Sequence, residues 1–418
     1  MSISNSPGDG EPSARQKIPP KSWLILALLF SAGLLNYFDR QTLSILKATL
    51  KVELGLTDTY YSYLVTVFMV PYIAMYLVSG RIVDRFGSRR PMAAFISSWS
   101  VATALAGAAQ NLWQLAGARA LLGAAEPGVF PAGMRAQVRW FPARRRAFLM
   151  SLNSPGTALG AILAPPVVAY LALRWGWRSA FVVPGLVGLG LAAMWWLVDR
   201  PEEENSVEAV PSAPVTPWRN TLSDRRFKGV LFARIITDPV WYFFLFWLPG
   251  YMQEKLGLSL SGLGAVGWIP SAVASAVGIL SAYWSDKAAA RSSDPALLRI
   301  KFIFWISLAA PMTLLINSAT SLPLIIGLLC VIYTIAQLWF FYSAVLLTDI
   351  IPAKSIAGAL GMLGAVGASV AMLVNLCIGP LVEHVGYAPV FACAAILHPI
   401  GAVVQWHYYK TSHKKACT

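Results

Sequence analysis

Residues 80–90 read Gly80-Arg-Ile-Val-Asp84-Arg85-Phe-Gly87-Ser-Arg89-Arg90 and stand between two apolar runs. Gly80 has no side chain, so it allows two helix backbones to approach closely. Asp84 can accept hydrogen bonds from a neighbouring helix N-terminus or from an arginine. We predict that this turn is a charged latch that gates one face of a helical membrane protein, formed by Gly80, Asp84, Arg85 and Arg89. The alternative is an ordinary basic loop.

The rest of the chain continues this alternation of apolar runs and polar turns. Of its 418 residues, 57% are hydrophobic and 12% are charged, whereas a soluble domain has about 25% charged residues. Each apolar run has roughly 20 residues, enough to cross a hydrocarbon core of about 30 Å. We therefore expect an all-α integral membrane protein with twelve transmembrane helices in two six-helix bundles. The helices are expected near residues 22–46, 60–80, 91–109, 112–134, 147–170, 179–198, 229–252, 262–283, 301–320, 322–346, 356–380 and 387–409.

The basic residues are distributed unevenly among the expected loops. Of the 33 Lys and Arg residues, 25 fall in the N-terminal segment, the even-numbered loops and the C-terminal segment. Five fall in the odd-numbered loops, namely Lys47, Lys51, Arg174, Arg178 and Lys255. The positive-inside rule then puts both termini in the cytoplasm. This topology in a lipid bilayer accounts for the net charge of +14, so we expect no nucleic-acid partner.

The two halves of the chain resemble each other at equivalent places. Glu53-Leu-Gly-Leu-Thr57 matches Lys255-Leu-Gly-Leu-Ser259, and Asp84 matches Asp286, both at an offset of 202 residues. The second copy of the latch has Ala282 where the first has a glycine, so we expect a weaker gate around Asp286. Parallel six-helix repeats place a substrate site near the midplane, between the halves.

A polar stretch divides these repeats. We expect a flexible cytoplasmic tail at residues 1–21, an N-terminal bundle at 22–198, a cytoplasmic linker at 199–228, a C-terminal bundle at 229–409 and a cytoplasmic tail at 410–418.

Charged residues inside the expected helices are costly in a bilayer and therefore indicate function. The first helix contains Asp39 and Arg40, and the fourth contains Arg119 and Glu126. Because a helix rises 1.5 Å per residue, Asp39 and Arg119 are expected at a similar depth, where they can pair. That pairing leaves Arg40 for an anionic ligand and Glu126 as a second proton site beside Asp39. Burial disfavours the charged form of a carboxyl group, so both can take up and release protons. The alternative is a structural set of salt bridges.

Arg234 and Asp238 lie four residues apart in the seventh helix, a spacing that places them on one face. Pro239 interrupts the helical hydrogen bonding beside them. Two interpretations stay open for this pair: a structural ion pair at a kink, or a gating element.

Aromatic and amide side chains deep in the expected helices suit a sugar-like ligand, because they combine apolar faces with hydrogen-bonding groups. The candidate ligand contacts are Tyr37, Tyr72, Trp241, Tyr242, Gln337 and Asn375. For each one alone, packing is the alternative. The chain has no Walker loop, no His-Glu-x-x-His, no Gly-x-Ser-x-Gly and no Cys/His cluster. We therefore expect neither an enzyme nor an ATP-driven pump, and no metal or other cofactor apart from a coupling proton.

These motifs carry a family resemblance. The turn at 80–90, the six-plus-six layout and Arg119-x-x-x-Gly123 resemble the major facilitator superfamily over nearly the full chain. Three motifs look like its anion:cation symporter family, namely Asn36-Tyr37-x-Asp39-Arg40, Gly123-x-x-Glu126-x-x-x-x-Pro131 and Trp140-Phe141-Pro142. The segments that are similar to bacterial hexuronate transporters are Gly123-Ala-Ala-Glu126, Pro131-Ala-Gly133, Ala164-Pro-Pro166 and Asp238-Pro239-x-Trp241. One departure is Asp238, because those proteins more often carry glutamate there.

The resemblance implies roles for individual residues. Arg40 matches the arginine that holds the substrate carboxylate. Asp39 and Glu126 match the carboxylates that couple proton uptake to transport. Arg119 matches the arginine linked to them and is a further candidate for contact with the substrate. Tyr37 and Tyr72 match tyrosines that line the N-terminal half of the site.

The resemblance and the charges together predict a bacterial inner-membrane symporter. It would import a small organic anion, a hexuronate or aldonate, with protons by alternating access, and we expect a monomer. Three alternatives stay open: a symporter of another aromatic or aliphatic carboxylate, a transporter-like receptor that binds without translocating, and a drug exporter. Sodium coupling is compatible with the same residues, although the lack of an oxygen-rich cluster favours the proton.

Overall fold

The computed structural model describes residues 20–141, 154–199, 218–352 and 355–416, and every regular element in these ranges is helical. The first group of elements is α1 (Pro20–Ile45), α2 (Lys47–Leu54), α3 (Asp58–Phe86), α4 (Arg89–Ala108), α5 (Leu112–Ala125), η1 (Glu126–Gly128), α6 (Val129–Trp140), α8 (Ser154–Trp175) and α9 (Ser179–Val198). The second group is α10 (Trp218–Ser223), α11 (Arg225–Glu254), α12 (Leu260–Val266), α13 (Ile269–Ala289), α14 (Pro295–Ser307), η3 (Ala310–Asn317), α15 (Leu322–Ile350), α16 (Ile356–His384) and α17 (Ala388–Ala416).

Within the described ranges, eleven helical segments are long and apolar enough to cross a membrane. The twelfth expected crossing, at 112–134, consists of α5, η1 and α6 in succession. It is interrupted at Glu126-Pro127-Gly128, because Pro127 has no amide hydrogen to donate to the helical ladder. The fold class predicted from the hydropathy pattern is confirmed, and the interruption places Glu126 at a break in the helix.

The expected helices are present, but several ends differ. α3 continues to Phe86 and α13 to Ala289, beyond the expected ends at 80 and 283, and α14 begins at Pro295, before the expected start at 301. The expected start of the fifth helix at 147 lies outside the described residues. α11 begins at Arg225, inside the stretch expected as a linker, and α17 continues to Ala416, beyond the expected end at 409. Most of the expected N-terminal tail and of the linker lies outside the described residues, at 1–19 and 200–217. The division into five parts therefore stays a prediction.

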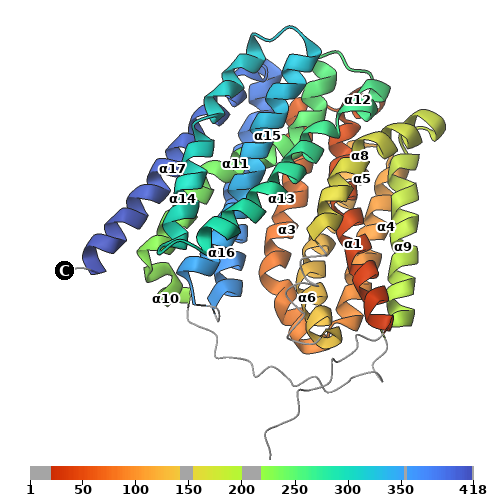
Figure 1. The fold of residues 1–418 in the computed structure, drawn as a ribbon. Coiled ribbons are helices and arrows are strands. Elements are labelled where there is room, and N and C mark those ends of the chain that lie inside the picture. Colours follow the sequence, from red (N-terminus) through yellow and green to blue (C-terminus); the bar gives the residue numbers. More distant parts are fainter. Residues whose placement is uncertain (1–19, 142–153, 200–217, 353–354, 417–418) are drawn as a thin grey trace, which may run out of the picture.

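The helices form two groups that stand side by side (Figure 1). In the N-terminal group, α4 packs against α9 and α1 against α8; in the C-terminal group, α11 packs against α17 and α13 against α15. Contacts between the groups are made mainly by α3 with α16, by α8 with α12 and by α1 with α11. The inner helices of each group thus face one another across the centre of the molecule.

Two glycines set the distance between α1 and α8. A methyl group on Gly156 would lie 2.6 Å from the carbonyl oxygen of Phe30, and one on Gly160 would overlap the carbonyl of Leu34. Small residues at such positions allow helix backbones to pack in contact. This contact fixes the orientation of α1, which carries Asp39 and Arg40.

Candidate functional site

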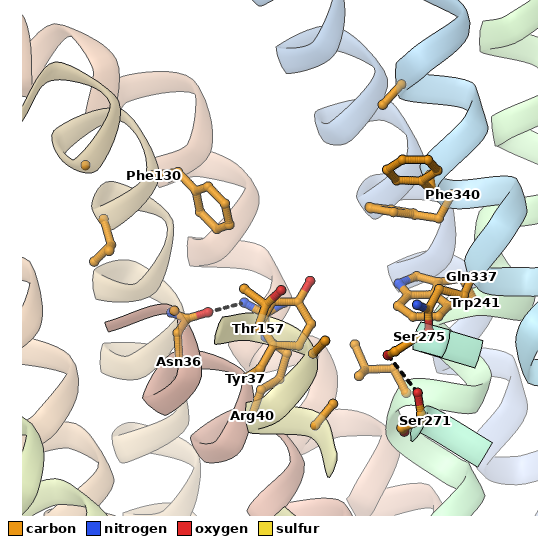
Figure 2. A pocket seen from close by; sticks show the side chains of 18 of the residues that line it. Asn36, Tyr37, Arg40, Phe130, Thr157, Trp241, Ser271, Ser275, Gln337 and Phe340 are labelled. Atoms are coloured by element: carbon orange, nitrogen blue, oxygen red, sulfur yellow. Dashed lines mark hydrogen bonds between the residues drawn. The ribbon is translucent and has the colours of Figure 1, made fainter. Parts of the chain in front are cut away.

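A cavity of about 570 Å³ lies between the two helix groups and is lined by both. Its size is within the range typical of small-molecule sites, roughly 300–1,000 Å³. Figure 2 shows Asn36, Tyr37, Arg40 and Thr157 on one side and Trp241, Ser271, Ser275 and Gln337 on the other. The cavity extends along α6 and α15 past Phe130, Met134 and Phe341, whose side chains are all exposed.

Six of the eight residues predicted to contact substrate line this cavity: Tyr37, Arg40, Tyr72, Trp241, Tyr242 and Gln337. Arg119 and Asn375 do not line it. Arg119 is buried inside the N-terminal group, and Asn375 is buried where α16 meets α3 and α11. Both positions are therefore unsuited to direct contact with a ligand in this conformation.

Arg40 is held at the cavity wall by Glu126. Its Nη2 lies 2.5 Å from Glu126 Oε2, and its Nε donates to the same oxygen at 3.1 Å. Nη2 also donates to Asn36 Oδ1 at 3.3 Å. The guanidinium centre lies 5.0 Å from the ring centroid of Tyr72 and 5.2 Å from that of Tyr37, distances at which a cation is attracted to an aromatic face. Arg40 is thus paired, and the expectation of a free Arg40 is wrong for this conformation.

Asp39 points away from Arg40, into the N-terminal group. Successive side chains of a helix are about 100° apart, so Arg40 faces the cavity while Asp39 faces α4. Thr103 Oγ1 donates to Asp39 Oδ2 at 3.3 Å, and Oδ1 has no hydrogen-bond partner in the described part of the chain. Asp39 is 2% exposed. A buried carboxylate with one unsatisfied oxygen is costly to keep ionised, which makes Asp39 suited to holding a proton.

Arg119 lies near Asp39 without pairing with it. Both residues line one small void, with Thr103 and Phe181, yet no Asp39–Arg119 ion pair within 4.0 Å is formed among the described residues. Two nitrogens of Arg119, Nε and Nη2, are buried without a partner there. The predicted Asp39–Arg119 pair is therefore replaced by Arg40–Glu126, because Glu126 at the helix break turns towards α1.

Arg234 and Asp238 form the ion pair expected from their spacing, with Nε and Oδ1 2.5 Å apart. Both are buried. The Arg234 guanidinium lies 4.2 Å from the ring centroid of Phe340, a cavity residue, and donates to its carbonyl at 3.4 Å. Gly367 of α16 leaves room for the Asp238 carboxylate, because a side chain there would overlap it. The pair therefore lies behind the cavity wall, and its gating role stays a prediction.

The latch turn at 80–90 lies open at one end of the molecule. The side chain of Asp84 is 85% exposed, and its ion-pair contact is a 3.8 Å approach to Arg135 of its own helix group. Arg89 stacks on Trp196 and donates to its carbonyl at 2.8 Å, whereas Arg85 only approaches the ring of Phe86. Among the described residues outside its own helix, no atom lies within 4 Å of a methyl group built on Gly80, so no other described helix makes the expected close approach there.

The second copy of the latch is tied together instead. Arg299 of α14 lies 2.8 Å from Asp286 of α13 and 2.5 Å from Asp349 of α15. Arg299 supplies two ion pairs that do not depend on the missing glycine, and the expected weaker gate around Asp286 stays a prediction.

A cluster of charges that sequence reasoning missed joins the helix groups at the opposite end. Lys47 Nζ lies 2.5 Å from Asp58 Oδ1 and 3.3 Å from Glu254 Oε2, and it donates to the Tyr387 hydroxyl at 3.0 Å. Lys51 Nζ lies 2.9 Å from Asp58 Oδ2 and 2.7 Å from Glu254 Oε1. We call these five residues the closure cluster. Lys47, Lys51 and Asp58 belong to the first group, and Glu254 and Tyr387 to the second.

The closure cluster is reinforced by neighbouring polar contacts. Asn375 Nδ2 donates to the carbonyl of Ser62 at 2.9 Å and its Oδ1 accepts from Trp247 Nε1 at 2.9 Å. Gln253 Nε2 donates to the carbonyl of Ile45 at 2.7 Å. Partial burial opposes the charge of Lys51, but its hydrogen bonds to Glu254 and Asp58 raise its pKa. The ion pairs and hydrogen bonds of the cluster therefore seal this end of the molecule.

One signal in the sequence pointed to this cluster. The internal repeat places residues 53–57 and 255–259 at the same end, next to Lys51 and Glu254. Opposite charges at equivalent ends of two repeats indicate a contact between the halves. The count of basic residues for the positive-inside rule used Lys47 and Lys51 only as loop residues and did not consider such a contact.

Two groups of membrane-length helices around a shared cavity, sealed at one end and open at the other, define a membrane transporter. Residues 29–345 match the model of the Major Facilitator Superfamily. The chain belongs to the Major Facilitator Superfamily, and it is a transporter rather than an enzyme.

Relatives and solved structures agree with this assignment. The chain is 29% identical to the hexuronate transporter of Escherichia coli strain K12 over 415 residues, 94% of each chain. It is 28% identical to a probable L-galactonate transporter of the same strain over 353 residues, 80% of this chain and 78% of that one. A bacterial homologue of the human lysosomal transporter Spinster, solved in an inward-facing and occupied conformation, shares its fold with a TM-score of 0.76. That structure is 17% identical and matches over 94% of this chain and 97% of its own.

Proposed function

We propose that this protein imports a sugar acid, a hexuronate or an aldonate, together with protons across a bacterial inner membrane. Relatives named for hexuronate and for L-galactonate transport support the substrate class. Among the described residues that line the cavity, Arg40 is the only one with a charged side chain. A guanidinium offers two parallel donors that match a carboxylate.

The ion pair between Arg40 and Glu126 is the observation that carries the proposal. Glu126 occupies the Nε and Nη2 donors of Arg40, so a substrate carboxylate that binds this edge of the guanidinium would compete with Glu126. Protonation of Glu126 removes its negative charge and weakens its hold on Arg40. Substrate therefore binds best when Glu126 carries a proton, and this dependence couples substrate binding to proton binding.

Asp39 supplies a second proton site in this scheme. It is adjacent to Arg40 in the chain and buried with one unsatisfied oxygen. Arg119 lines the same small void as Asp39. When α1 and α5 approach, the positive charge of Arg119 favours the charged form of Asp39. Movement of α1 against α5 would thus change the proton affinity of Asp39 without any contact between Asp39 and the substrate.

The orientation proposed for the transporter follows from its basic loops. The positive-inside rule assigns the cytoplasm to the end that carries both termini and the open latch turn. The closure cluster then faces the periplasm, and the conformation faces inward. Closing the latch and opening the closure cluster would present the cavity to the other side, and we propose that a monomer suffices for this.

The test is uptake of labelled glucuronate and galacturonate by proteoliposomes that contain the purified protein. We expect uptake that requires an inward proton gradient and that a proton ionophore abolishes. Gradient-independent equilibration would remove the proton from the proposal. Saturable binding without uptake would favour a non-translocating receptor. If neither sugar acid binds to folded protein, the substrate class is wrong and other organic carboxylates become the candidates.

A further inference from the structure

The two walls of the cavity differ in chemistry. The wall from the N-terminal group carries Arg40 with its partner Asn36. The wall from the C-terminal group carries aromatic, hydroxyl and amide side chains, and none of the described residues lining it is charged. Figure 2 shows Arg40 and Gln337 on opposite sides. A ligand that spans the cavity therefore meets a cation at one end and neutral groups at the other.

The aromatic part of the second wall is built around Trp241. Its ring is stacked on Phe340, with centroids 5.6 Å apart and planes at 27°, and it also contacts Tyr333 at 5.5 Å. All three residues line the cavity. The face of an aromatic ring carries negative charge density, so it attracts polarised C–H groups. A pyranose ring presents several such groups on one flat face, whereas an open-chain polyol does not hold them in a plane.

Hydrogen-bonding groups surround this aromatic surface. Ser275 Oγ donates to the carbonyl of Ser271 at 2.7 Å, which leaves the oxygen of Ser275 able to accept. The Gln337 side chain, on α15, lines the cavity. An amide offers two donors and an acceptor, so it can bind neighbouring hydroxyl groups of a sugar ring.

A second carboxylate would find no cation on this wall. The nearest charged pair behind it is Arg234 with Asp238, which is buried behind Phe340 and already joined at 2.5 Å. Bringing a carboxylate to that wall removes its hydration without replacing it by a charge partner, which is strongly unfavourable. The wall therefore disfavours a substrate with an acid group at both ends.

From this geometry we infer that the cavity selects cyclic uronates, pyranoses with a single carboxylate, over open-chain sugar acids, with Trp241 recognising the ring face and Gln337 its hydroxyl groups. The inference rests on the proposed function. It decides between hexuronates and aldonates, the two substrate classes that the proposed function does not separate. A ring also loses less conformational freedom than an open chain when it is fixed in a site. The relatives do not make this choice, since one is named for hexuronate and one for L-galactonate.

The experiment is competition against uptake of labelled galacturonate in proteoliposomes. The competitors form matched sets: glucuronate and galacturonate as rings, gluconate and galactonate as open chains, glucarate and galactarate as diacids. We expect each uronate to compete at a concentration at least about tenfold lower than its open-chain counterpart, the discrimination that one pocket contact typically provides. The diacids should compete least of all.

Two variants test the assigned residues. Trp241→Phe should bring gluconate and glucuronate to within about threefold of each other, since a smaller ring covers less of the pyranose face. Gln337→Lys should improve competition by glucarate, because it adds a cation to the neutral wall. Trp113→Phe, at an 87% exposed position away from the cavity, is the matched control and should change neither ratio.

The outcomes separate this inference from the proposed function. Equal competition by uronates and open-chain acids in the unmodified protein, with uptake still dependent on Arg40, would overturn the ring selection and leave sugar-acid transport standing. An unchanged preference in Trp241→Phe would overturn the role of Trp241. Absence of uptake or competition by every sugar acid would overturn both.

Discussion

Lys47 and Glu254 lie on different halves of the molecule, 207 positions apart in the chain, and their Nζ and Oε2 atoms are 3.3 Å apart. Lys47 is completely buried at this contact, and its Nζ lies 4.4 Å from the ring centroid of Trp247. An ion buried without its partner is destabilised by about 3–5 kcal/mol. The cluster therefore holds the halves together only while each charge keeps its partner.

Removing one partner should open the sealed end. In Glu254→Gln, Lys47 and Lys51 lose an anion, so the conformation open at that end becomes more populated. The measurement is the rate at which a membrane-impermeant maleimide, added only to the closure-cluster side of oriented vesicles, labels a cysteine at Leu245, a cavity residue, in a protein without other cysteines. We expect labelling to be faster by at least about tenfold, which corresponds to 1.4 kcal/mol. Lys255→Gln, an exposed neighbour, should leave the rate unchanged; the same increase in that control would contradict the assignment.

Arg40→Lys should raise the KM for sugar-acid uptake by at least about tenfold while the protein stays folded, because lysine keeps the charge but loses the planar pair of donors. The check is initial uptake rate against substrate concentration. Arg90→Lys, on the exposed side of the latch turn, serves as its control. A KM within twofold of the unmodified protein would show that the carboxylate binds elsewhere.

Glu126→Gln should lose accumulation against a gradient and keep exchange of substrate between the two sides. Glutamine cannot take up or release the coupling proton, yet it leaves Arg40 free for the substrate. Counterflow and gradient-driven uptake are measured on the same vesicles, with the exposed Glu53→Gln as control. If Glu126→Gln still concentrates substrate, Glu126 is not a coupling residue.

Gly160→Ala should destabilise the N-terminal helix group. The added methyl group overlaps the carbonyl of Leu34, and such overpacking typically costs about 1–3 kcal/mol. Thermal unfolding in detergent measures the effect as a lower midpoint. Gly190→Ala in α9 is matched to it, because no atom of the other described elements lies within 4 Å of the added group. This control should not lower the midpoint, since alanine favours a helix over glycine, and an equal fall in both variants would contradict the role of the contact with α1.

Much of the fold could be predicted from the sequence because its signals are local. Each span is a continuous apolar run, and the repeat at an offset of 202 residues gives the two halves. The lining residues Tyr37, Arg40 and Trp241 were recognisable because polar or aromatic groups deep in a span have few other uses. Features of this kind can be predicted from one segment of the sequence, without knowing which helices are neighbours.

The pairing of charges could not be predicted in the same way. Depth along a helix suggested Asp39 with Arg119, but rotation about the axis decides which side chains meet, and the break at 126–128 turns Glu126 to Arg40. Asn375 was expected in the site because a buried amide needs a partner; the structure supplies Ser62 and Trp247 instead. Long-range pairing of this kind depends on tertiary contacts that no single segment encodes.

The closure cluster also bears on how the cell would regulate uptake. In the proposed orientation, a carrier that the closure cluster holds shut on the periplasmic side offers its site to the sugar acid on the cytoplasmic side. As that pool grows, occupied carriers return their load outward instead of resetting empty, and net import slows. In this scheme the five side chains of the closure cluster, Lys47, Lys51, Asp58, Glu254 and Tyr387, would make the transporter self-limiting.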